Sequence, residues 1–451
     1  MLKALCAAGL ALVAALSVPR SPPSATVASS TEVFSWLAAR GGLLRVAVGA
    51  DPNGVRGLVA TEAAAIGTVL LQVPLNATLA DHGDGGGASL PGEPPEWCAA
   101  LPWNVQLALC VLQQRADGDS PWAAFLRSWP DEPPPLPKNL DSSQLAEAQD
   151  ELFEAEADSD YFWAEEQYLQ LTEAAEAAGL PPPCSAVELR VALEQVWSRC
   201  LRLTAGPYGV RRLLVPVLDL ANHEAQPSAL FTYCAAGGGS IRLHAARPLL
   251  KGEAVTITYG EHAAEHFCRY YGFVPEEDPH GSWRLRTATL LCALPGVPEA
   301  LESAALSPPE AGWAGVLAAL DLPSEIELGA LRSLAPPLAA VQAALQQVPG
   351  ADASESAAAA ALETALGELG GSRRTSLSED EALLRTMDEG AGSETRTLVQ
   401  MRLARKRLLA ELQARLREQP CAVEPPPLPS MYPALDALPT EELMAWGERP
   451  W

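Results

Sequence analysis

Short apolar runs separated by turn residues mark two β-rich stretches of this chain. Within residues 43–79 the runs are 44–48 and 69–73, and Asp51-Pro52-Asn53-Gly54 lies between them. Within residues 213–258 the runs are 213–215, 230–233, 241–243 and 255–258, with Gly237-Gly238-Gly239 as a hairpin loop. Such runs, bounded by Gly, Pro, Asn and Asp, are typical of strands in hairpins. The pattern therefore predicts a β-rich domain with a long interruption.

The interruption, at about residues 95–195, has apolar residues at helical spacing, and the proline-rich segments 133–135 and 181–183 break it. Beyond residue 284 strand patterns vanish, and Ala-, Leu-, Glu- and Gln-rich segments predict helices. The expected fold class is α+β: a β-rich domain with a helical insert, followed by an all-α C-terminal domain.

The longest of the later helical segments, residues 394–418, combines an apolar stripe with a basic cluster. The stripe consists of Leu398, Met401, Leu408, Leu412 and Leu416. The basic cluster consists of Arg402, Arg405, Lys406 and Arg407. Charge runs usually indicate a solvated face, so we expect these four side chains in solvent rather than in a binding surface.

The chain therefore divides into residues 1–31, a β-rich domain at 32–284, a helical domain at 285–420 and a proline-rich tail at 421–451. The tail lacks periodicity and is expected to be unstructured apart from a short helix at 440–446. Residues 1–31 begin with one Lys and an apolar run too short to span a bilayer, and contain no acidic residue. The apolar run resembles a secretory signal, and the Ser-, Ala- and Arg-containing remainder resembles a transit peptide. A bipartite plastid address contains both, so a plastid is expected; the secretory pathway, or the cytosol if this segment is not a signal, remains an alternative.

The net charge of the chain limits the classes of binding partner that are expected. The 451 residues include 56 acidic and 31 basic side chains, a formal net charge of −25. Such a chain repels a phosphate backbone, which excludes nucleic acid as an expected partner. A cationic protein or Lys-rich peptide suits this field, although acidity that serves only solubility explains the composition equally well.

The nine cysteines are far apart, without a C-x-x-C pair or a neighbouring His at zinc-ligand spacing. No metal is expected. Their dispersion in apolar runs favours free thiols over a disulfide framework.

Four segments carry candidate chemistry: Gly54 to Ala60, Ser198 to Leu201, Pro216 to His223, and Thr258-Tyr259-Gly260 followed by Tyr271-Gly272-Phe273-Val274. Taken singly, each has an ordinary structural explanation. Asn222-His223 would form a helix cap with a core histidine, Tyr259 a strand aromatic, and Ser198-Arg199 a surface turn.

In this order the segments resemble SET-domain methyltransferases of the rubisco lysine methyltransferase type, in which a helical insert splits the SET fold and a helical substrate-binding domain follows. The resemblance covers nearly everything after residue 32. It implies an S-adenosylmethionine-dependent protein-lysine N-methyltransferase that acts, as an expected monomer without stable membrane insertion, on a protein presenting a lysine. If the chain enters a plastid, the rubisco large subunit and fructose-bisphosphate aldolase become the first candidate substrates.

The resemblance also implies roles for individual residues. Tyr259 is the expected catalytic residue, and Tyr271 and Phe273 would wall the lysine channel unless they form a packed core pair. The expected cofactor-binding residues are Arg56, Gly57, Leu58, Ser198, Arg199, Asp219, Asn222 and His223. Asp219 alternatively caps the turn before Asn222. Leu201 and Ala264 depart from the family pattern, which leaves the number of added methyl groups open.

Two other functions remain. Related members of the same fold methylate a histidine of actin, and the channel residues do not decide between the two nucleophiles. A catalytically weak module that only grips a partner is the alternative from another class. The joint presence of Tyr259, Arg199 and Asn222-His223 favours an enzyme.

Overall fold

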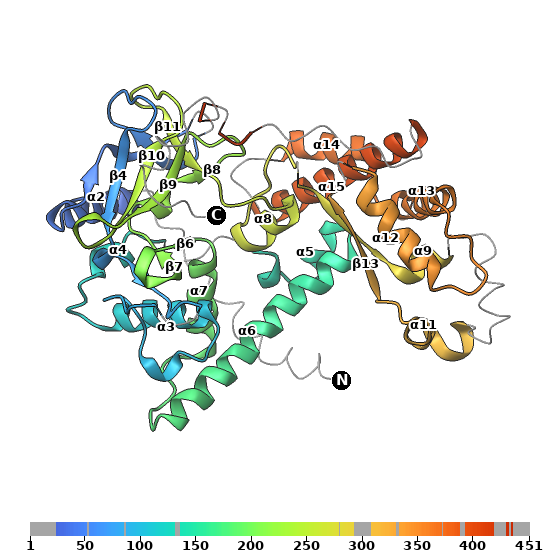
Figure 1. Cartoon of the computed structure of the whole chain (residues 1–451), viewed down its shortest axis with the longest axis horizontal. Coiled ribbons are helices and arrows are strands. Elements are labelled where there is room, and N and C mark those ends of the chain that lie inside the picture. Colours follow the sequence, from blue (N-terminus) through green and yellow to red (C-terminus); the bar gives the residue numbers. More distant parts are fainter. Residues whose placement is uncertain are drawn as a thin grey trace.

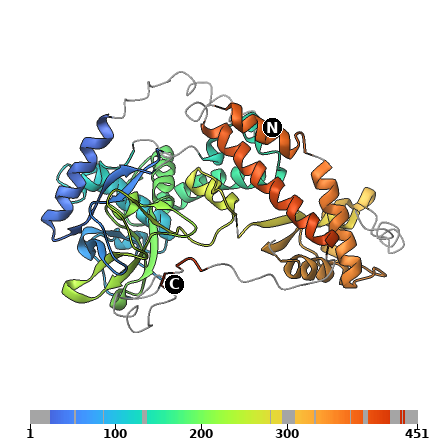
Figure 2. The same cartoon turned by 90° about the horizontal axis from the view of Figure 1, so that it is seen from above.

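The computed structural model describes residues 24–51, 54–84, 87–130, 136–278, 280–292, 308–330, 333–371, 373–387, 393–418, 430–432 and 434–435. Most strands lie at one end of the molecule with several helices around them, the other end is mainly helical, and one long helix runs between the two ends (Figure 1; seen from above in Figure 2). The predicted α+β class is confirmed.

The described strands of the β-rich end form three small sheets. One sheet has the order β1 (Leu43–Leu44), β4 (Val69–Pro74), β10 (Ser240–Ala245), β9 (Ala229–Cys234). A second has the order β2 (Val46–Ala50), β3 (Arg56–Ala60), β11 (Ala254–Ile257), β8 (Asn222–His223), and a third the order β5 (Leu79–Ala80), β7 (Val210–Leu214), β6 (Cys200–Thr204). The apolar runs of the sequence are thus confirmed as strands, and most of their side chains are buried in a shared core.

The second sheet brings two of the motif segments together. Strand β11 pairs antiparallel with β3, with Val255 opposite Leu58, and parallel with β8, with Thr256 opposite Asn222. The turn before β3 closes through the Asp51 carboxylate, which accepts a 2.8 Å hydrogen bond from the Val55 N–H. The segment Arg56–Leu58 and the pair Asn222-His223 therefore flank the same strand.

Helices occupy the interruption. They are α3 (Trp103–Ala116), α4 (Ala123–Leu126), α5 (Ser142–Leu145), α6 (Glu151–Ala177) and α7 (Ala186–Trp197). Helix α7 begins at a capping box in which Ser185 and Glu188 satisfy each other's backbone N–H groups, and it ends directly before Ser198. Helix α6 is the long diagonal helix of Figure 1.

The C-terminal part is helical, with a strand pair that the sequence pattern did not predict. Its helices are α9 (Thr287–Cys292), α11 (Pro308–Ala319), α12 (Ala335–Gln346), α13 (Glu355–Gly371), α14 (Leu377–Thr386) and α15 (Ser393–Glu418). Strands β12 (Ser282–Arg286) and β13 (Glu325–Ala330) pair antiparallel, so this part is not all-α. The alternation of buried Trp283 and Leu285 with Arg284 and Arg286 is the period-two signal, but it covers too few residues to stand out.

The expectation for the basic cluster of α15 is wrong for three of its four members. Arg402, Arg405 and Lys406 are buried, and Arg407 is exposed. Arg402 and Lys406 both bind the Asp380 carboxylate of α14, at 2.7 and 2.6 Å. The apolar stripe is buried as predicted apart from Leu408, which is half-buried. The sequence alone does not show which carboxylates reach these charges. It therefore predicts a solvated face where the structure has buried ion pairs.

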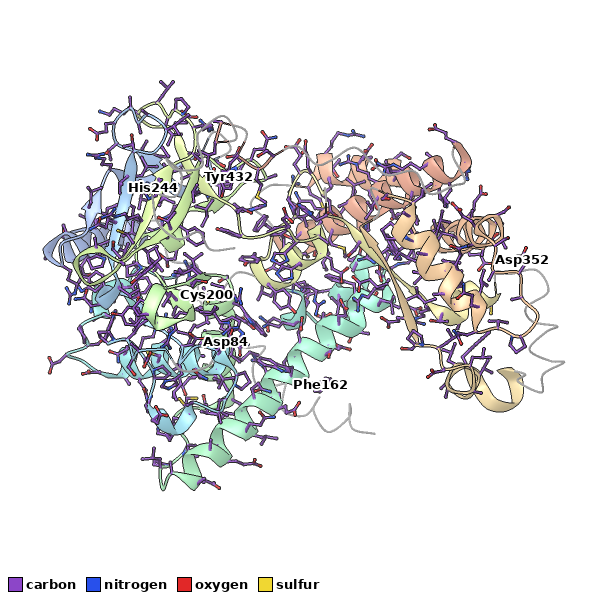
Figure 3. All side chains as sticks on the ribbon, in the orientation of Figure 1. Asp84, Phe162, Cys200, His244, Asp352 and Tyr432 are labelled. Atoms are coloured by element: carbon purple, nitrogen blue, oxygen red, sulfur yellow. The ribbon has the colours of Figure 1, made fainter. Side chains whose placement is uncertain are left out.

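The chain ends also have described parts. Helix α2 (Ser24–Ala39) crosses the predicted boundary at residue 31, and the rest of the proposed targeting segment, residues 1–23, lies outside the described residues. In the tail, Leu435 and the partly buried Tyr432 pack in one cluster with Leu230 and Ala246 of the β-rich end. Figure 3 shows Tyr432 beside that end. The short helix expected at 440–446 lies outside the described residues. Among the described residues no helix combines the length and apolarity needed to cross a bilayer.

Candidate functional site

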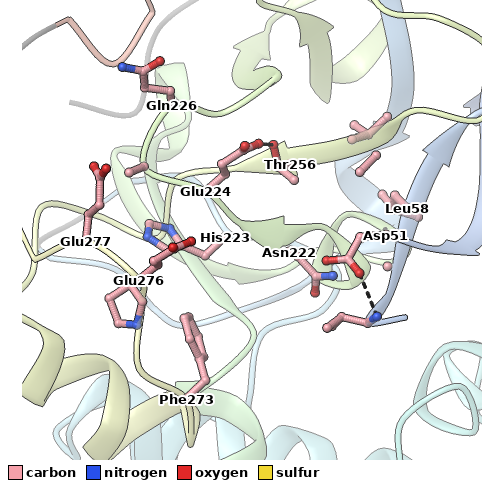
Figure 4. A pocket seen from close by; sticks show the side chains of 16 residues that line it. Asp51, Leu58, Asn222, His223, Glu224, Gln226, Thr256, Phe273, Glu276 and Glu277 are labelled. Atoms are coloured by element: carbon pink, nitrogen blue, oxygen red, sulfur yellow. Dashed lines mark hydrogen bonds between the residues drawn. The ribbon is translucent and has the colours of Figure 1, made fainter. Parts of the chain in front are cut away.

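Two neighbouring cavities beside helix α8 (Ala264–Tyr271) contain nearly all the predicted site residues. The larger, about 660 Å³, is lined among others by Gly57, Leu58, Asn222, His223 and Phe273 (Figure 4). The smaller, about 240 Å³, is lined among others by Ser198, Arg199, Asp219, Tyr259 and Tyr271. The two sets are in contact, because the Tyr259 N–H donates to His223 Nδ1 at 3.2 Å. The cavities therefore share a wall.

Tyr259 forms part of that wall. Its hydroxyl donates a 2.8 Å hydrogen bond to the Ala221 carbonyl oxygen, and its ring stacks on Tyr271 with centroids 4.9 Å apart. Burial raises the pKa of the phenol, and Tyr271 adds to this effect. The hydroxyl consequently stays protonated at physiological pH.

An ion pair between Arg199 and Asp219 lies in the smaller cavity. Arg199 Nη1 is 3.4 Å from Asp219 Oδ2, and Trp129 Nε1 donates to the same oxygen at 2.9 Å. Arg199 Nε and Asp219 Oδ1 are buried and have no hydrogen-bond partner among the described residues. Burial raises the pKa of Asp219, and Arg199 opposes this rise. Because buried polar atoms nearly always have partners, these two atoms indicate where a polar ligand would bind.

The backbone before Asp219 is strained. Val217 has φ 70° and ψ −40°, a conformation rarely adopted by a β-branched residue. The strained turn directs the Asp219 side chain toward Trp129 and Arg199. Among the described contacts, no hydrogen bond links the Asp219 carboxylate to the backbone of the turn, so these contacts do not support a capping role for Asp219. Strain of this kind concentrates at functional sites.

Gly57 is required by Asn222. A Cβ atom at position 57 would lie 2.5 Å from Asn222 Nδ2, which donates to the Arg56 carbonyl oxygen at 3.1 Å. The space that Gly57 leaves is thus filled by this amide. Arg56 is exposed and lines neither cavity, although partial desolvation and then the nearby Arg199 lower its pKa.

His223 is held neutral between aromatic rings. It stacks on Phe267 with ring centroids 4.5 Å apart, and Phe273 lies 6.1 Å away. Burial, assisted by His262, lowers the pKa of His223 to about 4. Since its Nδ1 accepts the Tyr259 N–H, the proton of the neutral ring is on Nε2.

Ser198 has a local role in this geometry. Its hydroxyl donates to the carbonyl oxygens of Glu194 and Gln195 in the last turn of α7, at 3.1 and 3.2 Å. The sequence left open whether Tyr271 and Phe273 wall the lysine channel or form a packed core pair. In the structure, Tyr271 lines the smaller cavity and Phe273 lines the larger one.

Sequence reasoning missed several residues of the site. Trp129 stands 90 positions from Asp219 and carries no motif. Ala221 contributes only its carbonyl group, which any residue has. The larger cavity is also lined by Asp51, Glu224, Glu276 and Glu277, which come from segments far apart in the sequence. Within the described part of the chain, no group of three or more His, Cys, Asp or Glu side chains could hold a metal ion.

No protein-family model and no curated protein matches this sequence. Solved structures nevertheless match its architecture, and the chain has a SET-domain fold of the LSMT type. The SET domain of LSMT bound to lysine and AdoHcy matches with a TM-score of 0.59 and 18% identity, over 87% of this chain and 91% of that one. Rubisco LSMT bound to AdoMet matches with a TM-score of 0.59 and 17% identity, over 89% and 92%. Rubisco LSMT bound to sinefungin and monomethyllysine matches with a TM-score of 0.59 and 16% identity, over 87% and 92%.

Proposed function

We propose that this chain is an S-adenosylmethionine-dependent protein-lysine N-methyltransferase. The observation that carries the proposal is the place of Tyr259 in the wall between a small, largely apolar cavity and a larger, more polar one. Methyl transfer to an amine needs the amine and the methyl donor held in line. Each of the two adjoining cavities would hold one of these reactants. The LSMT structures of the same fold contain lysine or monomethyllysine together with AdoHcy or sinefungin.

The smaller cavity suits a lysine side chain. Leu201, Leu218, Phe231 and Ile257 contribute apolar lining. Removal from water disfavours the ammonium form and therefore lowers the pKa of a bound lysine, which must be neutral to react. Tyr259 cannot serve as the base, since burial raises its pKa and keeps it protonated.

Tyr259 instead acts as a hydrogen-bond group. Its proton is donated to the Ala221 carbonyl oxygen, so the lone pairs of the phenolic oxygen are available as acceptors in the cavity. An acceptor at that place orients an amine N–H and stabilises a polarised methyl group through C–H···O contacts. The proposed role of the Tyr259 hydroxyl as an acceptor in the cavity follows because its own proton is donated to Ala221.

The residues of the larger cavity and its wall fit the cofactor. S-adenosylmethionine supplies the methyl group, carried on a cationic sulfonium. Arg199, which lines the smaller cavity and whose Nε is buried without a partner among the described residues, would hold the cofactor carboxylate where the two cavities adjoin. Asn222, His223 and the backbone of Arg56–Leu58 would hold its amino group and adenine. The acidic side chains that line the larger cavity suit its positive charge.

The substrate is proposed to be a protein segment that presents lysine, and the chain's net charge of −25 favours a cationic one. We further propose a plastid location on the composition of residues 1–31, with the rubisco large subunit and aldolase as first candidate substrates. Expressing residues 1–31 fused to a fluorescent protein tests the address. Fluorescence confined to the cytosol would remove the plastid proposal without affecting the proposed chemistry.

Transfer of a labelled methyl group tests the activity. The purified chain is incubated with a plastid extract and methyl-labelled S-adenosylmethionine, and labelled residues are located by mass spectrometry, with Tyr259→Phe as the control. Label on lysine supports the proposal, and label on histidine indicates the alternative nucleophile. Cofactor binding without transfer to any extract protein would favour the binding module.

A further inference from the structure

Helix α8 presents two opposite faces to two different parts of the molecule. Phe267 and Tyr271, four positions apart, lie on one face. Phe267 stacks on His223 at 4.5 Å, and Tyr271 stacks on Tyr259 at 4.9 Å. This face of α8 therefore forms one side of the candidate site.

The other face of α8 carries Glu265 and Arg269, about half a helical turn from Phe267 and Tyr271. Glu265 accepts a hydrogen bond from the Arg405 guanidinium of α15. Its second carboxylate oxygen lies 3.5 Å from Arg284 Nη2 on β12. Both contacts come from the C-terminal part of the chain.

Several contacts restrict the movement of the Arg405 side chain. Its side chain is 6% exposed, and its Nε lies 3.0 Å from Asp150 Oδ2 at the start of α6, an ion pair without hydrogen-bond geometry. Its guanidinium carbon lies 4.2 Å from the Trp283 ring centroid. A planar guanidinium fixed by two carboxylates and an aromatic face has little freedom to rotate.

Packing adds to these polar contacts. Cys268 of α8 belongs to the same buried cluster as Leu398 and Met401 of α15. The first turn of α8 is capped by Asp278, whose carboxylate accepts the Ala264 N–H at 3.0 Å. A Cβ atom on Gly281 would lie 2.8 Å from Leu408 of α15, so the turn that carries Asp278 fits closely against that helix.

We infer that Arg405 is a positioning residue for the candidate site: it holds α8 through Glu265, and α8 holds the Tyr271 ring against Tyr259. The C-terminal helical domain thus completes the amine cavity in addition to any part in substrate docking. This inference rests on the proposed function for the meaning of the cavity, but the link from Arg405 to α8 can be tested without it.

Hydrogen exchange of the full-length chain tests the link. The variants are Arg405→Gln, Arg405→Lys, and Arg407→Gln as the matched control, because Arg407 lies on the same helix and pairs with Glu381 at an exposed site. In Arg405→Gln we expect exchange at residues 264–271 to accelerate about tenfold beyond the change common to all helices, with partial rescue in Arg405→Lys. Arg407→Gln should leave α8 unchanged. Equal acceleration in every helix, or none in α8, would overturn the inference.

Binding of free monomethyllysine tests the consequence for the cavity. The ligand is titrated calorimetrically into each variant in saturating AdoHcy, and AdoHcy is titrated separately. We expect Arg405→Gln to weaken monomethyllysine binding about tenfold or more, with a much smaller effect on AdoHcy. Unchanged monomethyllysine affinity in a folded Arg405→Gln variant would contradict the coupling to the cavity.

The two experiments separate this inference from the proposed function. If the unmodified chain binds neither ligand, the proposed function fails, while hydrogen exchange still decides whether Arg405 positions α8. If Arg405→Gln does not fold, Glu265→Gln replaces it, since that change leaves the contacts of Arg405 with Asp150 and Trp283 in place. The same local acceleration in α8 is then expected.

Discussion

The hydroxyl of Tyr259 donates a 2.8 Å hydrogen bond to the carbonyl oxygen of Ala221. Ala221 directly precedes Asn222-His223, and the Tyr259 N–H returns a bond to His223 Nδ1 at 3.2 Å. The candidate catalytic residue is thus tied twice to the segment proposed to hold the cofactor. Changes on either side of this link should have separable effects.

Replacing Tyr259 by Phe should lower turnover about 10²-fold or more, because a preorganised polar group leaves the reacting centre. Affinity for S-adenosylmethionine should change little, since the ring and its stacking on Tyr271 remain. Steady-state methylation and calorimetry measure the two effects. Tyr270→Phe is the control, because that hydroxyl faces Asp160 on α6 at 3.4 Å. Normal turnover in Tyr259→Phe would remove Tyr259 from the chemistry.

Arg199→Ala should weaken S-adenosylmethionine binding by about 1.5–3 kcal/mol through loss of a charge-assisted hydrogen bond. Trp129→Phe should cause a smaller loss in the same direction, because Asp219 loses its 2.9 Å donor while the aromatic face near Arg199 remains. Calorimetric titration of both folded variants checks the order. Unaltered affinity in both would assign the ion pair to structure alone.

Gly57→Ala and Asn222→Ala should have overlapping effects on cofactor affinity. The new Cβ at position 57 would displace the Asn222 amide from its bond to the Arg56 carbonyl oxygen. Either change alone should weaken binding by about 1.5–3 kcal/mol, and the double variant should lose little more, because coupled residues are not additive. Additive losses would show that Gly57 contacts the cofactor independently of Asn222.

Asp380→Asn should destabilise the chain by about 3 kcal/mol or more, since two buried cations lose their shared carboxylate. The neighbouring Glu381→Gln removes a pair with Arg407, which is largely solvent-exposed, and should cost about 0–1 kcal/mol. Urea unfolding of both variants gives the comparison. Similar midpoints for the two would show that the buried network contributes little.

Stability should fall as the pH drops from about 6.5 toward 4. Burial lowers the pKa of His223 and of His266 to about 4 in the folded chain, whereas an unfolded histidine titrates near 6.5. Between these values the unfolded state binds more protons, so the contribution is complete above about pH 6.5 and is lost as the pH falls to about 4. His266→Gln should show a shallower decline of the melting temperature over this range. An identical decline would assign the effect to other groups.

The sequence by itself determined many strands of the β-rich end and the helices of the insert, but not the strand pair β12 and β13. Apolar runs with turn residues between them predicted β4, β9, β10 and β11, because largely buried strands need runs of apolar and β-branched residues. It also named residues that the structure places around two adjoining cavities, since Arg199, Asn222 and Tyr259 belong to short segments whose order is itself a pattern. The order of residues along the chain, without their positions in space, was enough for these conclusions.

Only the tertiary structure decided which distant groups meet. Trp129 reaches Asp219 across 90 positions, and Arg405 reaches Glu265 across 140. The charges of α15 were expected in solvent, and three of them are buried, because a buried cation is tolerated only where folding brings carboxylates to it. A charged residue on a helix has the same local pattern whether or not such a partner arrives. Position in space, which periodicity does not encode, decides between the two outcomes.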